Sequence, residues 1–135
     1  VADRQNVFDL VGRGLDLLSD CVLVGVTKIV VHCQVRADWQ LLRADGVLEM
    51  ELRFTLRTDD GALISMSSFG LRHGPPEVIE KLARGENVDS RHYYFRTVMR
   101  FETAAPAVDW LNRILAIAKG QREPRAVRLD VYEVE

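Results

Sequence analysis

The segment from His92 to Thr103 carries a row of side chains that could move protons or hold an anion. Its polar and apolar residues alternate, which is typical of a strand, because successive side chains of a strand point to opposite faces. Turned into a closed cavity, the polar face would supply an imidazole, guanidinium groups and a carboxylate; turned to water, it is an ordinary solvated strand. The polar face consists of His92, Tyr94, Arg96, Arg100 and Glu102, with Val98 among them. The opposite face consists of Tyr93, Phe95, Thr97, Met99 and Phe101.

The histidines and cysteines do not form a metal-binding pattern. His32, His73 and His92 are scattered, and no two of them have the spacing of metal ligands. The adjacent pair His32 and Cys33 is too few for a zinc site. The sequence also contains no phosphate-binding loop, no dinucleotide-binding glycine motif and no Gly-x-Ser-x-Gly nucleophile motif. We therefore expect neither a metal nor another cofactor.

The charge balance argues against a nucleic-acid partner. The chain has 18 Lys and Arg residues and 20 Asp and Glu residues, which gives a net charge of -2. Phosphate binding normally needs a concentrated basic surface. The run Tyr93, Tyr94 and Phe95, with arginines beside it, could stack on bases. With this net charge we favour the alternative that the run is part of the wall of a barrel.

Cysteine use and the apolar runs bear on cellular location. Cys21 and Cys33 bound the apolar stretch CVLVGVTKIVVHC, where free thiols behave as small hydrophobic groups. We interpret both as reduced, which predicts a cytoplasmic protein. The first residues, VADRQNVFDL, lack the features of a signal peptide. The longest apolar-rich run, residues 21–31, contains Lys28 and is far shorter than the ~20 residues of a membrane helix, so no membrane association is expected.

The elements that must position these side chains are predicted to be mostly strands. A length of 135 residues with 47% hydrophobic content predicts one domain, residues 1–135, with its own core. Residues 47–57 alternate cleanly between apolar and polar side chains, and turn residues lie on both sides of them. Further strands are predicted at 21–35 (one strand or two short ones), 36–42, 62–69, 92–103 and 126–134.

Three other segments require a choice between helix and strand. A Gly-Pro-Pro turn followed by PEVIEKLARG predicts a short helix near residues 76–84. Apolar residues at steps of three and four predict a helix over residues 7–18. Residues 108–118 fit either element, and a strand that pairs with 126–134 across a polar turn is favoured. The many closely spaced strands predict an all-β fold, an antiparallel barrel or sandwich, with the helix near 76–84.

Several segments from Ala37 onward resemble one family. In chain order they are ADWQLLRADG, RFTLRTDDGALI, GLRHGPPEVIEKLARGE, YYFRT, RFET and WLNRILA. They are similar to the domain of unknown function family 3237, also called uncharacterised protein family 0311. The first 36 residues depart from the family pattern, since Val35-Arg36 stands where the family has a Gly-Gly pair.

The resemblance implies a compact antiparallel β-barrel, calycin-like or similar, with a set of polar positions and no agreed activity. The Gly-Pro-Pro turn after Arg72 and His73 is expected to hold both side chains at the mouth of the barrel. An acid, an imidazole and arginines around an apolar cavity would suit a small anionic or carbonyl-bearing molecule. The alternative is that these acids and arginines form buried ion pairs that fix the strand register. The positions that the resemblance implies for the site are Asp38, Trp39, Arg72, His73, Tyr94, Arg96, Glu102, Trp110 and Asn112.

Three kinds of function follow from this set. A binding barrel would hold a carboxylate or phenolate with its arginines. A cofactor-independent isomerase, lyase or cyclase would use His73 or Glu102 for proton transfer. An interaction module would instead have a filled interior and an exposed apolar patch. Because the divergent first 36 residues leave a strand edge that invites pairing, we also expect a homodimer or larger homo-oligomer.

Overall fold

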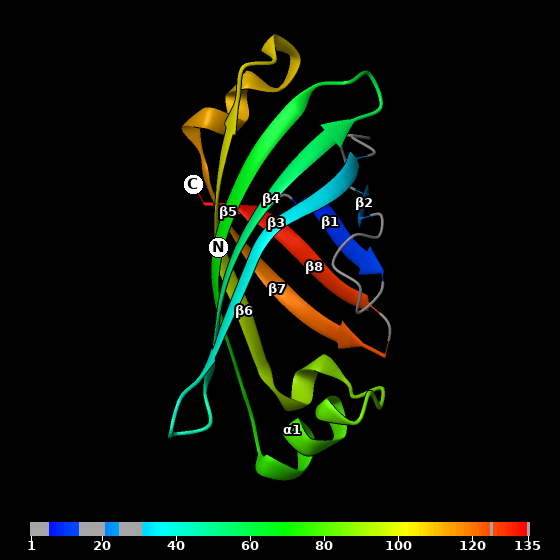
Figure 1. Ribbon diagram of the computed structural model, residues 1–135, viewed down its shortest axis with the longest axis vertical. Helices are drawn as coiled ribbons and strands as arrows, with labels where there is room; N and C mark the ends of the chain where they lie inside the picture. The colour runs from blue at the N-terminus through cyan, green and yellow to red at the C-terminus, as the bar shows by residue number, and fades with distance from the viewer. Residues whose placement is uncertain (1–5, 14–20, 25–30, 125, 135) are drawn as a thin grey trace.

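The protein is built on one antiparallel β-sheet, seen in a computed structural model that describes residues 6–13, 21–24, 31–124 and 126–134. The order of strands in the sheet is β2-β1-β8-β7-β6-β5-β4-β3. Strands β3 to β8 follow one another in chain order, and β1 and β2 extend the sheet beyond β8 (Figure 1). The strands are β1 (Asn6–Arg13), β2 (Cys21–Val24), β3 (Val31–Leu42), β4 (Leu48–Thr58), β5 (Leu63–His73), β6 (Tyr94–Thr103), β7 (Leu115–Glu123) and β8 (Ala126–Glu133).

Strand β4 shows why this chain forms a sheet. Its residues alternate, so one face can be buried while the other meets water. Met50 is buried, whereas Glu51 and Arg53 are exposed. The turns on either side of β4 place Gly46 at a φ of 83° and Gly61 at a φ of 89°, which glycine adopts without steric cost.

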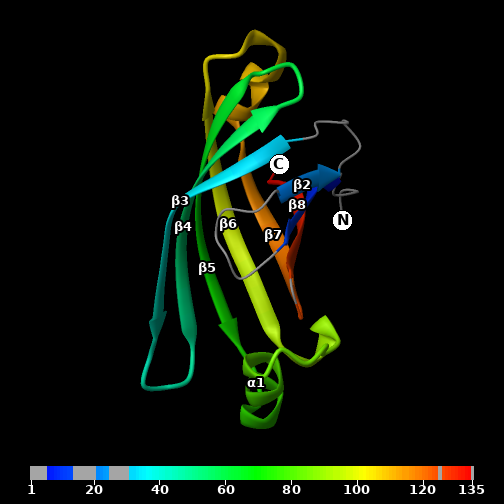
Figure 2. The ribbon, with the colours of Figure 1, turned by 45° about the vertical axis from the view of Figure 1, so that its right-hand side comes forward.

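The sheet twists and curls, so that its two halves lie on opposite sides of an interior (Figures 1 and 2). Side chains of the inner face form the core. The edge strands β2 and β3 approach within 8 Å, but no hydrogen-bonded ladder joins them among the described residues. The mostly β fold is therefore confirmed, while closure into a barrel is not seen. The largest fully buried side chains are Phe101, Leu56, Ile64, Met66 and Val131.

Short helical segments lie at the two ends of the sheet (Figure 1). Helix α1 (Pro76–Ala83) follows β5, begins with a proline in its first turn, and buries Leu82. The 3-10 segment η1 (Ser90–His92) leads from this end into β6. The 3-10 segment η2 (Pro106–Arg113) connects β6 to β7 at the other end.

Most of the predicted elements are confirmed. The strands expected at 36–42, 47–57, 62–69 and 126–134 fall in β3, β4, β5 and β8. The helix near 76–84 is α1, and the segment 21–35 contains two strands rather than one.

Two element predictions are wrong. Residues 7–13 lie in strand β1, which pairs with β8 and β2, so tertiary pairing overrides the helical spacing; residues 14–18 lie outside the described part of the chain. The segment expected as a strand over 108–118 is helical as far as Arg113 and β7 begins only at Leu115, although the predicted pairing with 126–134 is confirmed from Ala116 onward. The 3-10 turns form there because Val108 and Leu111 can both be buried from one side of η2.

Candidate functional site

The concave face of the sheet combines small residues with polar groups. The register aligns Gly70 on β5, Thr97 on β6 and Ala118 on β7 as one row across the sheet. Gly120 lies one row further along β7, and a Cβ atom there would lie only 2.5 Å from carbon atoms of the Phe95 ring. The sheet therefore contributes little side-chain volume along this part of β5 and β7, next to the aromatic ring of Phe95.

Two hydroxyl groups on this face have no hydrogen-bond partner in the described part of the chain. They belong to Ser68 and Thr97, whose exposed fractions are 4% and 3%. Ser68 pairs with Met99 and Thr97 pairs with Gly70, so the two hydroxyl-bearing residues are diagonal neighbours on β5 and β6. Buried polar atoms are normally hydrogen-bonded, because an unsatisfied one costs free energy. Two of them side by side mark this part of the face as incomplete on its own.

Arg72 and Arg122 bring positive charge to the end of the same face, near α1. Arg72 pairs with Leu48 and Phe95, and its guanidinium carbon lies 5.9 Å from the centre of the Phe95 ring. Burial lowers the pKa of Arg72, and the positive charge of nearby Arg122 lowers it further. Neither arginine forms an ion pair within the described residues. Together they present positive charge without a carboxylate to balance it.

Tyr93 links this charged end to the start of β6. Its hydroxyl oxygen accepts a hydrogen bond of 2.8 Å from the backbone N–H of Arg122. Burial raises the pKa of the Tyr93 phenol, although the neighbouring charges of Arg72 and Arg122 act in the opposite direction. The phenol is thus held as a neutral group beside the two arginines.

Strand β3 adds two further polar residues to the inner face. Asp38 pairs with Leu52, and Gln40 pairs with the buried Met50, which places both on the concave side. The Gln40 amide donates to both carboxylate oxygens of Asp38 at 3.2 Å. Of the residues that the family resemblance implies for the site, only Asp38 and Arg72 lie on this face.

The polar face of the 92–103 segment points outward, so the solvated-strand alternative is correct for its exposed side chains. Tyr94 stacks on exposed His73 with ring centres 4.9 Å apart, and the Arg96 guanidinium lies 5.3 Å from the Tyr94 ring. The carboxylate of Glu102 pairs with Arg100 at 2.6 Å, and both side chains are exposed. Buried ion pairs among the acids and arginines of the expected site are likewise absent from the described residues.

Arg72 and His73 do not face a common mouth, which corrects that expectation. They are consecutive residues of β5, and consecutive side chains of a strand point to opposite faces. Trp39 also lies on the outer face, where it pairs with Glu51 and is 58% exposed.

Trp110 and Asn112 lie on η2, at the opposite end of the sheet from α1 (Figure 1). Trp110 is half-buried against the core. The Asn112 side chain accepts a 2.8 Å hydrogen bond from the backbone N–H of Thr103 and donates one of 2.9 Å to its carbonyl oxygen. These contacts anchor η2 to the end of β6, so Asn112 has a structural explanation.

Sequence reasoning missed four residues of the concave face, namely Ser68, Tyr93, Thr97 and Arg122. The alternation of β6 does place Tyr93 and Thr97 on one face, opposite the polar residues that the sequence singles out. Within the described residues, no group of three or more His, Cys, Asp or Glu side chains could hold a metal ion. No helix in that part of the chain is long and apolar enough to span a membrane.

These features define a class: a mostly β protein whose curled antiparallel sheet carries charged and hydroxyl groups on its concave side. The chain belongs to the family described as protein of unknown function (DUF3237), whose model matches residues 15–134. It is 41% identical over 98 residues to a UPF0311 protein of Rhodopseudomonas palustris, a match that covers 73% of this chain and 64% of that protein. It is 39% identical over 97 residues to a UPF0311 protein of Clostridium acetobutylicum, covering 72% and 61%. The matches thus span less than two thirds of these curated relatives.

Solved structures of relatives share the fold. A conserved protein of unknown function from Rhodopseudomonas palustris is similar with a TM-score of 0.86 and 32% identity, over 98% of this chain and 97% of that chain. A protein from Acinetobacter baumannii that is described as β-barrel-like has a TM-score of 0.73 and 31% identity, over 98% and 96%. The relatives support the fold, and none of their descriptions assigns a ligand.

Proposed function

We propose that this protein binds a small organic acid on the concave face of its sheet. The observation that carries the proposal is the pair Arg72 and Arg122, half-buried, close to each other and without a carboxylate partner in the described residues. A carboxylate ligand would supply the missing negative charge, and arginine can hold it with two parallel hydrogen bonds. Burial strengthens this attraction, because the site is less screened than open water.

The unpaired hydroxyls narrow the chemistry of the ligand. Ser68 and Thr97 lie further from α1 than Arg72, and rows of the inner face are spaced by about 6.8 Å along a strand. A hydroxyl or carbonyl group on the ligand, placed beyond its carboxylate, would pair with them. The expected ligands are therefore hydroxy- or oxo-substituted carboxylic acids.

Closure of the sheet into a barrel belongs to the same proposal. The approach of β2 to β3 and the β-barrel-like relative support it. A closed sheet would surround the ligand and exclude water from its carboxylate. The catalytic roles suggested for His73 and Glu102 stay predictions, and neither residue lies on the concave face. Binding is therefore favoured over catalysis.

The test uses two matched pairs of acids: benzoate with 4-hydroxybenzoate, and phenylacetate with phenylpyruvate. Binding to the purified protein is followed by NMR chemical shifts and by calorimetry. Charged hydrogen bonds contribute about 1.5–3 kcal/mol, so Arg72→Gln is expected to weaken binding by about 10- to 100-fold. Arg100→Gln is the control, because this arginine is exposed on the outer face. Thr97→Val should weaken only the hydroxy- and oxo-acids.

The results separate the two parts of the proposal. If no acid of either pair binds, or if Arg72→Gln leaves the affinity unchanged, the anion site is refuted. If both members of each pair bind equally and Thr97→Val has no effect, the anion site stands and the role of the hydroxyls is refuted. Thermal melting of each variant shows that it is folded.

A further inference from the structure

The outer face of the sheet carries a row of residues across six strands in which five side chains are apolar or aromatic and one, Glu51 on β4, is acidic. The exposed fractions of its side chains are high: 58% for Trp39, 45% for Phe69 and 54% for Val98. Single exposed apolar residues are ordinary, but a contiguous group on the outside of a sheet marks an interaction surface. The register aligns the row as Trp39, Glu51, Phe69, Val98, Ile117 and Tyr132.

A hollow of about 500 Å³ lies over the middle of this row. Its lining is mainly apolar and includes Phe69, Val98 and Ile117. Exposed Leu115 and Val134 extend the lining, and a hydrogen bond of 2.9 Å from the Val134 N–H to the Leu115 carbonyl joins the two residues. The hollow can therefore accept an apolar side chain from outside the molecule.

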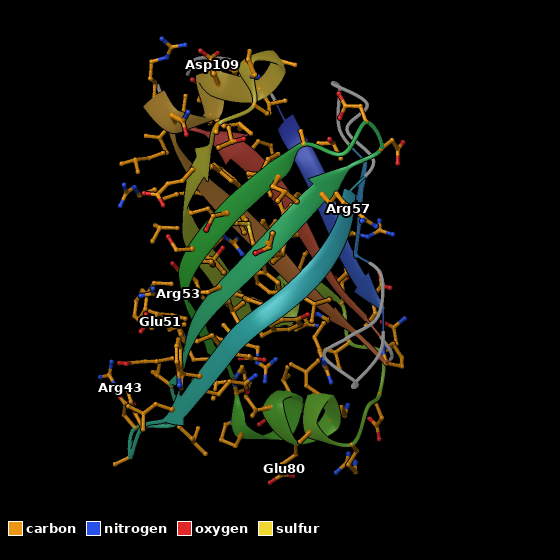
Figure 3. The ribbon with its side chains drawn as sticks, turned by 45° about the horizontal axis from the view of Figure 1, so that its top comes forward. Arg43, Glu51, Arg53, Arg57, Glu80 and Asp109 are labelled. Carbon is orange, nitrogen blue, oxygen red and sulfur yellow. The ribbon has the colours of Figure 1, made fainter. Side chains whose placement is uncertain are left out.

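The charges around the hollow alternate in sign. Arg53 pairs with Glu51 at 3.6 Å on β4, and Arg100 pairs with Glu102 at 2.6 Å on β6. Glu51 and Arg53 project outward from the sheet (Figure 3). A partner of one charge sign, such as an anionic membrane or a basic peptide, would meet repulsion from half of these groups. A partner surface that carries both positive and negative groups can be attracted instead. The outer face of a second copy of this chain carries such a mixture.

The edge strand β3 provides apolar side chains on the same outer face that could enter the hollow of a second copy. Trp39 and Leu41 are exposed on the outward side of β3, the last strand of the sheet. Trp39 and Ile117 lie two strands from Phe69, on either side of it. A twofold axis that runs along the strands beside Phe69 would therefore bring the Trp39 side of each copy toward the Ile117 side of the other.

We propose that a second copy of this chain covers the outer face, with the Trp39 edge of each copy in the hollow of the other. Such a contact is isologous, since the same patch is used on both copies, and it closes as a dimer. It requires neither the anion site nor barrel closure, because the apolar row lies on the opposite side of the sheet.

Sedimentation velocity between about 1 and 100 µM protein tests the proposal. We expect wild-type protein to dimerise in this range, and Val98→Arg to raise the dissociation constant at least about 100-fold by placing a charge in the hollow. Trp39→Ala should weaken the dimer as well. Ser65→Arg is the matched control, since Ser65 is exposed on the outer face of β5 but does not line the hollow. Phe69→Lys replaces Val98→Arg if thermal melting shows that variant to be unfolded.

A wild-type protein that stays monomeric at about 100 µM would leave the face to a different partner and overturn the proposal. A dimer that withstands Val98→Arg would show that another surface joins the copies. A dimer that is lost with Val98→Arg but withstands Trp39→Ala would refute the seating of the β3 edge in the hollow.

Discussion

The hydroxyl of Thr97 offers a direct test of whether the concave face is complete without a ligand. Replacing Thr97 by valine keeps the shape of the side chain and removes the oxygen. A Cβ atom at Gly70 would lie 2.6 Å from the Thr97 methyl group, so only glycine fits opposite Thr97. Valine at position 97 keeps this methyl group in place. An unsatisfied buried hydroxyl costs about 1–3 kcal/mol, so Thr97→Val should raise the free energy of unfolding by about 1 kcal/mol. For a domain of this size the melting temperature should rise by about 3–5 °C.

The same strand provides the control. The Thr103 hydroxyl donates a 2.7 Å hydrogen bond to the Leu63 carbonyl and accepts one of 3.1 Å from the Ala105 N–H. Thr103→Val makes the same chemical change and should lower the free energy of unfolding by about 1–2 kcal/mol, because it leaves both backbone groups without their partner. Urea unfolding of both variants at one protein concentration measures the two changes.

Whether Thr97→Val raises or lowers the free energy of unfolding decides whether the Thr97 hydroxyl lacks a partner in the free protein. If Thr97→Val destabilises the protein as much as Thr103→Val does, the Thr97 hydroxyl is satisfied in the free protein. It could not then be kept for a ligand, and the reasoning from unpaired hydroxyls would fail. A stabilised variant that binds hydroxy-acids less tightly would show that the site costs stability, as functional sites often do.

Two further predictions concern the ends of the sheet. Asn112→Ala should lower the free energy of unfolding by about 1–2 kcal/mol, through loss of both hydrogen bonds to the Thr103 backbone, and leave binding of organic acids unchanged in calorimetry. Weaker acid binding in this variant would instead restore Asn112 to the site. Hydrogen bonds from the side chain and then the backbone of Arg91 lower the pKa of Asp89 from 3.8 to about 2. Since the folded pKa is below the unfolded value, the stabilisation is present above about pH 4 and disappears as the pH falls through 2. The urea midpoint of Asp89→Asn should thus lie below that of wild type at pH 6 and approach it near pH 2; a gap that does not change with pH would contradict this assignment.

The parts of the fold that sequence could predict are those with local causes. Strand β4 was predictable because alternation and two glycine turns suffice to define it, and α1 because proline begins it. Strand β1 was not, because its residues fit a helix until β8 and β2 pair with it. Its conformation depends on partners far away in the chain.

The site was harder to predict for the same reason. Alternation alone would have separated Arg72 from His73, but which face of β5 is concave depends on how the whole sheet curls (Figures 1 and 2). On β3 the alternation itself is interrupted, because a register shift lies between Val35 and Ala37, just before Asp38 pairs with Leu52. The proximity of Arg122 to Arg72 depends on the pairing of β6 with both β5 and β7.

Thr97 and Val98 show how the two proposed surfaces can be told apart. They are consecutive residues of β6, one buried on the concave face and the other exposed on the outer face. Changing the first should affect acid binding and stability but not the dimer, and changing the second should affect the dimer but not acid binding. If Val98→Arg also weakens acid binding while the protein stays folded, and the acid affinity of wild type changes over the concentrations at which it dimerises, the sheet responds to the partner copy. In that case assembly would regulate the concave site, because β6 is the strand that the two surfaces share.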